Sequence, residues 1–309
     1  MLDFSEEVFC PICPQDTGSK LFINCGDRFN EPRSLNFQLY KCSGCGLIFL
    51  NPRPSQTEME SAYQEEGYDP FQSLEKPKGI FDRAYRLART YALAWKKRLV
   101  NKIVEPGAKI LDGGCSTGEF LSVLKDQYVV EGFEPEPDAA RWAGNRFGLT
   151  VHTGNLNTVS FQNDGFDLVT LWHVLEHIPE LQPDVTRIHQ LLRPGGKFLI
   201  AVPNVGSLDA KIYKENWIAL DAPRHLWHFT LPSINSLASS TGFKIVRTGM
   251  LPLDTVYNVL LSEQLAIGTY GRIQLMKAIF RFPFAIIGSM IYGLFTGSHS
   301  SRYYILEKV

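Results

Sequence analysis

An acidic residue followed directly by a glycine-rich turn is the clearest chemical feature of this 309-residue chain. Asp112 ends an apolar run, and Gly114 and Gly118 follow it at the start of a predicted helix. The spacing lacks the three-glycine pattern that binds a dinucleotide pyrophosphate. An acid beside the free amides of a helix start suits a ligand with an ammonium and a carboxylate, because each group meets its opposite charge. S-adenosylmethionine carries both groups, so the loop predicts a site for this cofactor.

A second acid strengthens this prediction. Glu134 lies 22 residues after Asp112, at the end of the next apolar run, Tyr128–Phe133. An acid at this place can accept hydrogen bonds from ribose hydroxyls. The two acids together therefore indicate a nucleoside cofactor.

Over roughly Ala108 to Thr248 the chain resembles the class I S-adenosylmethionine-dependent methyltransferases. The loop from Asp112 to Gly118 resembles the first motif of that family, with Ser116 where a glycine is common. Glu134 matches the ribose-binding acid. Three further segments resemble family motifs and follow in the family's order: Gly154–Leu156, Phe166–His177 with its His-Val-Leu-Glu-His run, and Leu191–Ile200.

This resemblance implies a set of cofactor-binding residues. The segment at Asn155 commonly reads the adenine edge, and His173 is expected to line the methionine end of the cofactor. A core or hydrogen-bonding role is expected for His177. The full set for the cofactor is Asp112, Gly114, Cys115, Gly118, Glu134, Asn155, Leu156 and His173.

Two histidines are candidates for catalysis at the methyl acceptor. They lie in the segment Asp221–Pro232, after the fifth predicted strand. In the related methyltransferases a His-x-x-His-Phe-Thr run lies near the acceptor pocket, which implies catalytic roles for His225 and His228. As an alternative, His228 packs before a helix whose Thr-Leu-Pro start is a typical N-terminus. Arg224 either binds an acidic group of the substrate or pairs with Asp221 at the surface.

Four of the six cysteines form two C-x-x-C pairs, which are Cys10 with Cys13 and Cys42 with Cys45. In a reducing cytosol this spacing favours zinc over disulfides. Two such turns complete a closed tetrahedral site, which is structural. The alternatives are a loop that has lost its metal and a redox pair, although no thioredoxin-like pattern surrounds either pair. Residues 1–52 are expected to form a small zinc ribbon, similar to that of some bacterial methyltransferases, a few of which act on sugars.

The bulk composition limits the possible partners. The chain has 31 basic and 32 acidic residues, for a net charge of −1. Phosphate binding requires a basic surface, so we expect a small-molecule substrate and no nucleic acid. The first residues show neither a basic leader nor an apolar core, so a cytoplasmic protein is expected.

Residues 53–105 are expected to be a linker followed by a basic amphipathic helix. One helical turn is predicted around Glu58–Glu65, and in similar proteins the stretch Tyr63–Tyr68 often reaches the cofactor pocket. The helix, Ile80–Val104, has an apolar stripe on one side. Its other side is either solvated or a contact for a phosphorylated or lipid-linked substrate at a membrane. The bases on that side are Arg83, Arg86, Arg89, Lys96, Lys97, Arg98 and Lys102, against the single acid Asp82.

From residue 106 to 309, strands and helices alternate as in a doubly wound α/β domain. We expect a Rossmann-like sheet of seven mostly parallel strands, with ligands at their carboxyl ends. The predicted strands are Lys109–Asp112, Val129–Glu134, Leu149–Thr153, Phe166–Leu171, Lys197–Val202, Phe243–Thr248 and Tyr303–Lys308. The predicted helices between them are Gly118–Lys125, Pro137–Phe147 and Leu181–Leu192.

An apolar insertion over residues 251–297 separates the last two strands. Its apolar stretches, Val256–Ile267 and Phe282–Phe295, do not reach the roughly 20 residues of a membrane span. A helical hairpin that serves as a lid or dimer contact is favoured over interfacial membrane attachment, because Arg281 and Pro283 interrupt the apolar pattern. The alternative is peripheral membrane contact through this insertion and the basic helix. If the insertion is a dimer contact, the chain forms a homodimer.

These features predict an S-adenosylmethionine-dependent methyltransferase with a structural zinc. The expected acceptor is a sugar or sugar-linked intermediate of surface polysaccharide or natural-product biosynthesis. A quinone or lipid methyltransferase at the membrane surface would explain the apolar insertion and the basic helix. A non-catalytic module that binds RNA or protein is disfavoured by the intact acid pair and by the acidic N-terminal segment.

Overall fold

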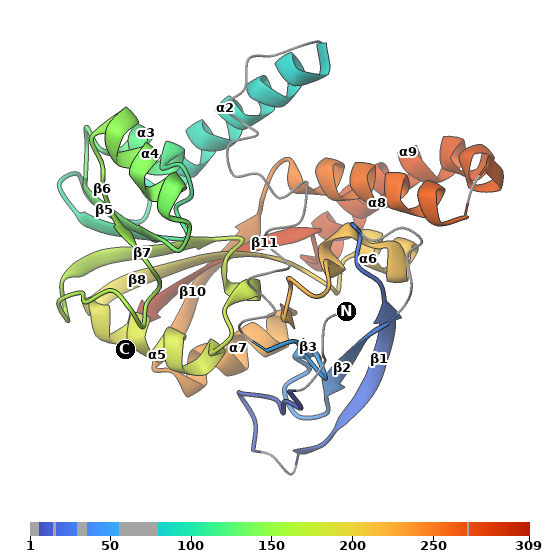
Figure 1. The fold of residues 1–309 in the computed structure, drawn as a ribbon, viewed down its shortest axis with the longest axis horizontal. Coiled ribbons are helices and arrows are strands. Elements are labelled where there is room, and N and C mark those ends of the chain that lie inside the picture. Colours follow the sequence, from blue (N-terminus) through green and yellow to red (C-terminus); the bar gives the residue numbers. More distant parts are fainter. Residues whose placement is uncertain (1–5, 15–16, 30–35, 56–79, 271) are drawn as a thin grey trace.

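The computed structural model describes residues 6–14, 17–29, 36–55, 80–270 and 272–309. The helical turn predicted around Glu58–Glu65 and the stretch Tyr63–Tyr68 lie outside the described residues. Figure 1 shows the arrangement of the elements.

A seven-stranded sheet is the centre of the fold, with the strand order β10-β11-β8-β7-β4-β5-β6. Neighbouring strands from β8 to β6 are parallel, and β11 runs antiparallel to both β8 and β10. This confirms the predicted fold class. The strands are β4 (Lys109–Gly113), β5 (Val129–Glu134), β6 (Thr150–Thr153), β7 (Phe166–Trp172), β8 (Leu192–Pro203), β10 (Phe243–Met250) and β11 (Ser301–Lys308).

Helices cover both faces of this sheet (Figure 1). Side chains alternate between the faces of a strand, so Leu111 packs in one core and its neighbour Ile110 in the other. The first core includes α5 (Leu181–Leu191) and α7 (Leu231–Ser240), and the second includes α2 (Ile80–Val100) and α3 (Glu119–Leu124). Within the described ranges, the remaining helical elements before the insertion are α4 (Pro137–Phe147), α6 (Leu208–Tyr213), η2 (Leu175–His177), η3 (Lys214–Asn216) and η4 (Ile218–Leu220). Helix α2 ends four residues before the predicted Val104.

The N-terminal segment forms a second, smaller sheet with a segment from late in the chain. Its order is β1 (Ser19–Cys25), β2 (Phe37–Cys42), β3 (Ile48–Leu50) and β9 (Trp227–His228), all antiparallel. In addition, the Leu50 N–H donates to the Leu226 carbonyl at 3.0 Å. The predicted ribbon therefore shares hydrogen bonds with the segment that carries the candidate catalytic histidines.

The insertion is a helical hairpin of α8 (Asp254–Tyr270) and α9 (Arg272–Thr296). The predicted interruption at Arg281 and Pro283 is absent, since α9 continues through both residues. Glu263 on α8 neutralises the charge of Arg281, whose Nε donates to Glu263 Oε2 at 3.0 Å. In the described part of the chain, we find no helix with the length and apolar character needed to cross a bilayer.

Candidate functional site

The glycine loop after β4 has the backbone that its sequence requires. Gly114 and Gly118 adopt the left-handed φ values 61° and 74°, which favour glycine. A Cβ on Gly114 would lie 2.7 Å from Val174, and one on Gly118 would lie 2.7 Å from Leu149. Ser116, where glycine is common in similar loops, also adopts a left-handed backbone conformation, with φ 49°. Both glycines are therefore needed for the chain to turn closely from β4 into α3.

Asp112 lies at the end of β4 with 3 % of its surface exposed. The Thr170 hydroxyl on the neighbouring strand β7 donates to Asp112 Oδ1 at 2.5 Å. Burial raises the pKa of Asp112 to about 7, while the Thr170 hydrogen bond and the Lys96 charge oppose the rise. A cationic ligand group beside this carboxylate would favour its ionised form.

Lys96 is a site residue that the sequence did not reveal. The prediction placed it on the basic side of a helix, yet its ammonium lies 4.3 Å from the centre of the Trp172 ring. Burial lowers the pKa of Lys96 to about 8, and the charges of Asp112 and Asp254 oppose this shift. Lys96 thus provides a positive charge near the acid at the end of β4.

Glu134, at the end of β5, points back to the glycine loop. Its Oε2 accepts from the Ser116 N–H at 2.7 Å and its Oε1 from the Glu136 N–H at 3.0 Å. Burial raises the pKa of Glu134, and these two backbone hydrogen bonds counteract the rise. The charge of Glu134 also raises the pKa of Asp112, so the two acids act on the same region. Two acids beside one loop are expected for S-adenosylmethionine, whose amino acid end would lie near Asp112 and whose ribose would lie near Glu134.

Three other residues of the predicted cofactor set pack around the loop or in the core. Cys115 is buried, and a Cβ on Gly132 would come within 2.7 Å of its sulfur. Leu156 is buried in the main core. The Asn155 carboxamide oxygen accepts from the N–H groups of Asn157 and Thr158 at 2.9 and 3.1 Å, which closes a local turn. Direct contact of Asn155 with adenine stays a prediction.

His173 joins the end of β7 to the start of α8. Its Nδ1 lies 3.4 Å from Glu176 Oε1, and its Nε2 lies 3.0 Å from Asp254 Oδ2. Burial lowers the pKa of His173, but the contacts with the Asp254 and Glu176 carboxylates outweigh it and raise the pKa to about 10. A charged His173 therefore anchors the insertion, and its contact with the cofactor stays a prediction.

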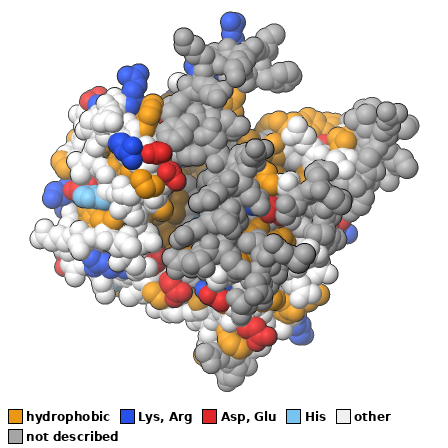
Figure 2. All heavy atoms as spheres, in the orientation of Figure 1, with side chains coloured by type: hydrophobic (Ala, Val, Ile, Leu, Met, Phe, Trp, Pro, Cys, Tyr) orange, Lys and Arg blue, Asp and Glu red, His pale blue; other side chains and the backbone are white. Residues whose placement is uncertain are grey.

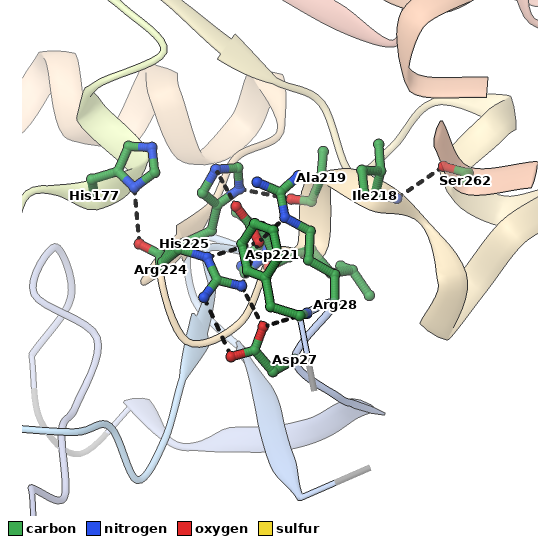
Figure 3. Close-up of polar contacts among 12 residues, drawn as sticks. Asp27, Arg28, His177, Ile218, Ala219, Asp221, Arg224, His225 and Ser262 are labelled. Atoms are coloured by element: carbon green, nitrogen blue, oxygen red, sulfur yellow. Dashed lines mark hydrogen bonds and ion pairs between the residues drawn. The ribbon is translucent and has the colours of Figure 1, made fainter. Parts of the chain in front are cut away.

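His177 and His225 meet at the carboxyl side of the sheet (Figure 3). Their ring centres are 4.6 Å apart and their planes are 78° apart. His177 Nδ1 lies 3.0 Å from the Arg224 carbonyl, and His225 Nδ1 lies 2.9 Å from the Ala219 carbonyl. Burial and the charge of His177 lower the pKa of His225 well below its ordinary value. The fold therefore brings His177, for which a core or hydrogen-bonding role is expected, next to the predicted catalytic residue His225.

A family model described as a methyltransferase domain matches residues 81–248, which is more than half of the chain. The chain belongs to this methyltransferase family. Together with the fold and the acid pair, this match identifies a class I S-adenosylmethionine-dependent methyltransferase.

Three proteins similar to this chain are distant from it in sequence. An uncharacterised protein of Methanocaldococcus jannaschii is 26 % identical over 149 residues, which is 45 % of this methyltransferase and 55 % of that protein. The chain thus spans only about half the length of that relative. A demethylmenaquinone methyltransferase of Bacillus cereus is 22 % identical, over 59 % of this chain and 87 % of its own. Magnesium protoporphyrin IX methyltransferase of Synechocystis PCC 6803, solved with bound SAH, is 15 % identical with a TM-score of 0.53, over 82 % of this chain and 100 % of its own. The last comparison supports the fold.

His228 of the methyltransferase has a packed environment. It is 3 % exposed, pairs with Ile48 in the small sheet, and its Nε2 lies 3.0 Å from the Leu220 carbonyl. Burial lowers its pKa to about 4. Helix α7 begins after Thr230 with a capping box, as the alternative interpretation expected. These contacts favour the packing role for His228 over the catalytic one.

Arg224 is held in a buried ion network between the methyltransferase domain and the N-terminal segment (Figure 3). Its guanidinium is completely buried and donates to Asp221 Oδ1 at 2.9 Å and to Asp27 Oδ1 at 2.5 Å. Arg28 Nε also lies 3.0 Å from Asp221 Oδ1. The predicted pairing with Asp221 is present, but it is in the interior instead of at the surface. Asp27 had no local sequence signal, because 197 residues separate it from Arg224.

The four cysteines of the two C-x-x-C pairs come together in the methyltransferase's N-terminal segment. Their sulfur atoms all lie within 4.8 Å of one another, and Cys10 and Cys45 are separated by 3.5 Å. Sulfurs around a tetrahedral zinc lie about 3.8 Å apart, given Zn–S bonds of about 2.3 Å. The cluster therefore fits a metal ion of this kind.

Proposed function

We propose that this methyltransferase moves a methyl group from S-adenosylmethionine to a sugar or a sugar-linked intermediate of surface polysaccharide or natural-product biosynthesis. The observation that carries methyl transfer is the convergence of Asp112 and Glu134 on the glycine loop. The adjacent imidazoles of His177 and His225, which can hydrogen-bond to hydroxyl groups, support an acceptor rich in such groups. The likeness of the N-terminal segment to ribbons of bacterial methyltransferases, some of which act on sugars, supports the same acceptor class.

Positioning is the main task of the protein in this reaction. S-adenosylmethionine, when bound, supplies a methyl group on a positively charged sulfur. This sulfur leaves as a neutral thioether, so the leaving group does not need a proton. Alignment of two reactants contributes about 7–11 kcal/mol to catalysis. The acids at the ends of β4 and β5 hold one reactant. The His225 segment, fixed by β9 and the Arg224 network, holds the other.

A hydroxyl acceptor also has to lose a proton, and His225 is placed to act on it. Its Nδ1 faces a carbonyl, which can only accept, so in the neutral ring the lone pair lies on Nε2. His225→Ala is expected to lower turnover by about 10²-fold or more, the usual contribution of a proton-transfer group. Cofactor affinity should stay at the wild-type value, because Asp112 and Glu134 are unchanged.

Steady-state kinetics with the acceptor and calorimetry with the cofactor test this prediction. His152→Ala is the matched control, since this partly exposed histidine contacts Glu131 on a neighbouring strand and should keep full turnover. A normal rate for His225→Ala would remove His225 from the mechanism.

We propose that the ion in the cysteine cluster is zinc and that its role is structural. Cys42→Ser is expected to lose the zinc and to disturb β3, which follows Cys45 and pairs with β9. Activity should then fall through displacement of the histidine segment. Metal analysis of the purified protein should give one zinc in this cluster for wild type and for Cys25→Ala, and none there for Cys42→Ser. Wild-type protein without zinc after reducing purification would refute the assignment.

A membrane-surface acceptor, such as a quinone or another lipid, is the second candidate. Residues 282–301 contain no Asp, Glu, Lys or Arg. The hairpin also exposes many large apolar side chains, and apolar atoms are visible at the surface near it (Figure 2). These side chains are Val256, Tyr257, Leu260, Phe280, Phe284, Ile287, Met290, Ile291, Leu294 and Phe295. An apolar face of this kind is typical of an interaction site.

Vesicle flotation tests this second candidate. If it is correct, the wild type should float with phosphatidylglycerol vesicles, while Phe284→Ser/Leu294→Ser should stay behind. Val129→Ser, which changes an exposed apolar residue on β5, should float like the wild type. Recovery of the wild type only in the soluble fraction would reject membrane attachment, and a dimer there would assign the face to a second copy of the chain.

A further inference from the structure

Three side chains near the predicted acceptor site form a cluster of residue types that bind metal ions. Glu176 and His177 belong to η2, and His225 comes from the segment before β9. One ligand atom from each lies within 4.8 Å of the other two. We propose that Glu176, His177 and His225 bind a divalent first-row transition metal ion, separate from the ion of the cysteine cluster.

The two imidazoles have the hydrogen bonds that orient metal-binding histidines. Each has its Nδ1 at about 3 Å from a backbone carbonyl, that of Arg224 for His177 and that of Ala219 for His225. A carbonyl only accepts, so Nδ1 is the donor and Nε2 of the neutral ring is the ligand atom. Histidines that bind metals almost always make such a bond with the other ring nitrogen. His225 Nε2 has a further weak contact, with Asp221 Oδ2 at 3.9 Å.

The Glu176 carboxylate supplies an independent observation. Only 1 % of this residue is exposed, and neither carboxylate oxygen has a hydrogen-bond partner among the residues that the structure describes. In the described part of the chain its ion pair is the 3.4 Å contact of Oε1 with His173 Nδ1. The His173 contact reaches Oε1 alone, so the charge of this buried carboxylate is only partly compensated, and a cation in the cluster would compensate for the rest.

The backbone holds the cluster together before any ion binds. The Leu226 N–H donates to the Glu176 carbonyl at 2.8 Å, and the His177 bond to the Arg224 carbonyl crosses the same two segments. The buried Arg224 network fixes the second segment in turn. Such preorganisation reduces the reorganisation that metal binding would otherwise require.

One carboxylate and two imidazoles are a ligand set found with zinc, iron and related divalent ions. Three protein ligands leave a position for an oxygen atom. On the proposed function, that oxygen belongs to the acceptor hydroxyl, whose proton the ion would make easier to release to water. In this case His225 acts as a metal ligand and not as the base. His225→Ala is expected to reduce turnover in either role.

The test is a calorimetric titration of Co²⁺ into protein whose cysteine cluster is already loaded with zinc. Wild type should bind one further equivalent. Glu176→Gln, which keeps the shape of the side chain, and His225→Ala should each weaken this binding at least tenfold. Glu180→Gln, an exposed glutamate close in sequence, is the matched control and should bind as wild type does.

The absorption spectrum identifies the site that is filled. Nitrogen and oxygen ligands give weak visible bands, whereas exchange into the cysteine cluster would give intense sulfur-to-cobalt bands and would count against the proposal. No further equivalent in the wild type, or unchanged binding by both variants, would overturn it. Titration of the same samples with S-adenosylmethionine separates the two proposals, since cofactor binding without a second metal rejects only this inference.

Discussion

Asp112→Ala is expected to weaken S-adenosylmethionine binding more than tenfold, or about 1.4 kcal/mol in binding free energy. The carboxylate is 3 % exposed and is held by Thr170 at the end of β4, so its place beside the glycine loop is fixed. Glu134→Ala should have an effect of the same size, because its carboxylate is fixed beside the glycine loop. Titration calorimetry measures both affinities directly.

Two further variants make this experiment specific. Asp112→Asn keeps the size of the side chain and a possible Thr170 contact, so a loss of affinity there reports the missing charge. Glu131→Ala, on the same strand as Glu134, should retain wild-type affinity because its carboxylate faces His152. Unchanged titrations for both Asp112→Ala and Glu134→Ala would count heavily against the assigned cofactor site.

Arg224→Met should lower the free energy of unfolding by about 3–5 kcal/mol, the usual loss when one partner of a buried ion pair is removed. The substitution leaves the Asp27 and Asp221 carboxylates in the interior without their shared cation. Urea unfolding followed by fluorescence measures the change. Strands β1 to β3 should also lose their fixed place against β9, because Asp27, which follows β1, would no longer be paired with Arg224.

Arg193→Met is the control for this stability prediction. Arg193 is largely exposed and pairs with Asp167 at 2.6 Å, so its loss should change stability by at most about 1 kcal/mol. Equal effects of the two substitutions would mean that the buried network does not stabilise the fold.

The cofactor loop could be predicted because its parts are adjacent in the chain. Asp112, Gly114 and Gly118 lie within one strand-turn-helix unit, whose geometry follows from local residue types. The seven strands were also predicted, since each is a short apolar run between turns. Glu134 was found for the same reason, at the end of a strand of the same kind.

The contacts between distant segments could not be predicted. The hydrogen bonds of β3 with β9 and the pair of Asp27 with Arg224 join residues about 180–200 positions apart. The pairing of His173 with Asp254 depends on how the insertion folds back on β7. No local periodicity reports such packing, so the sequence does not show that His177, expected to have a core or hydrogen-bonding role, lies beside His225.

The pattern of charges was misleading at two places for the same reason. Lys96 reads as one more base on a basic helix, but α2 packs so that this side chain lies near Trp172 and Asp112. Arg281 reads as an interruption of an apolar stretch, but Glu263 on α8 neutralises it. In both cases the partner comes from another element.

The most direct test of the central claim is a crystal structure of the protein with S-adenosylhomocysteine. The ribose hydroxyls are predicted to donate to the Glu134 carboxylate, with the amino acid end beside Gly114 and Asp112. A product bound elsewhere, or a Glu134 side chain turned away from the ribose, would contradict the account.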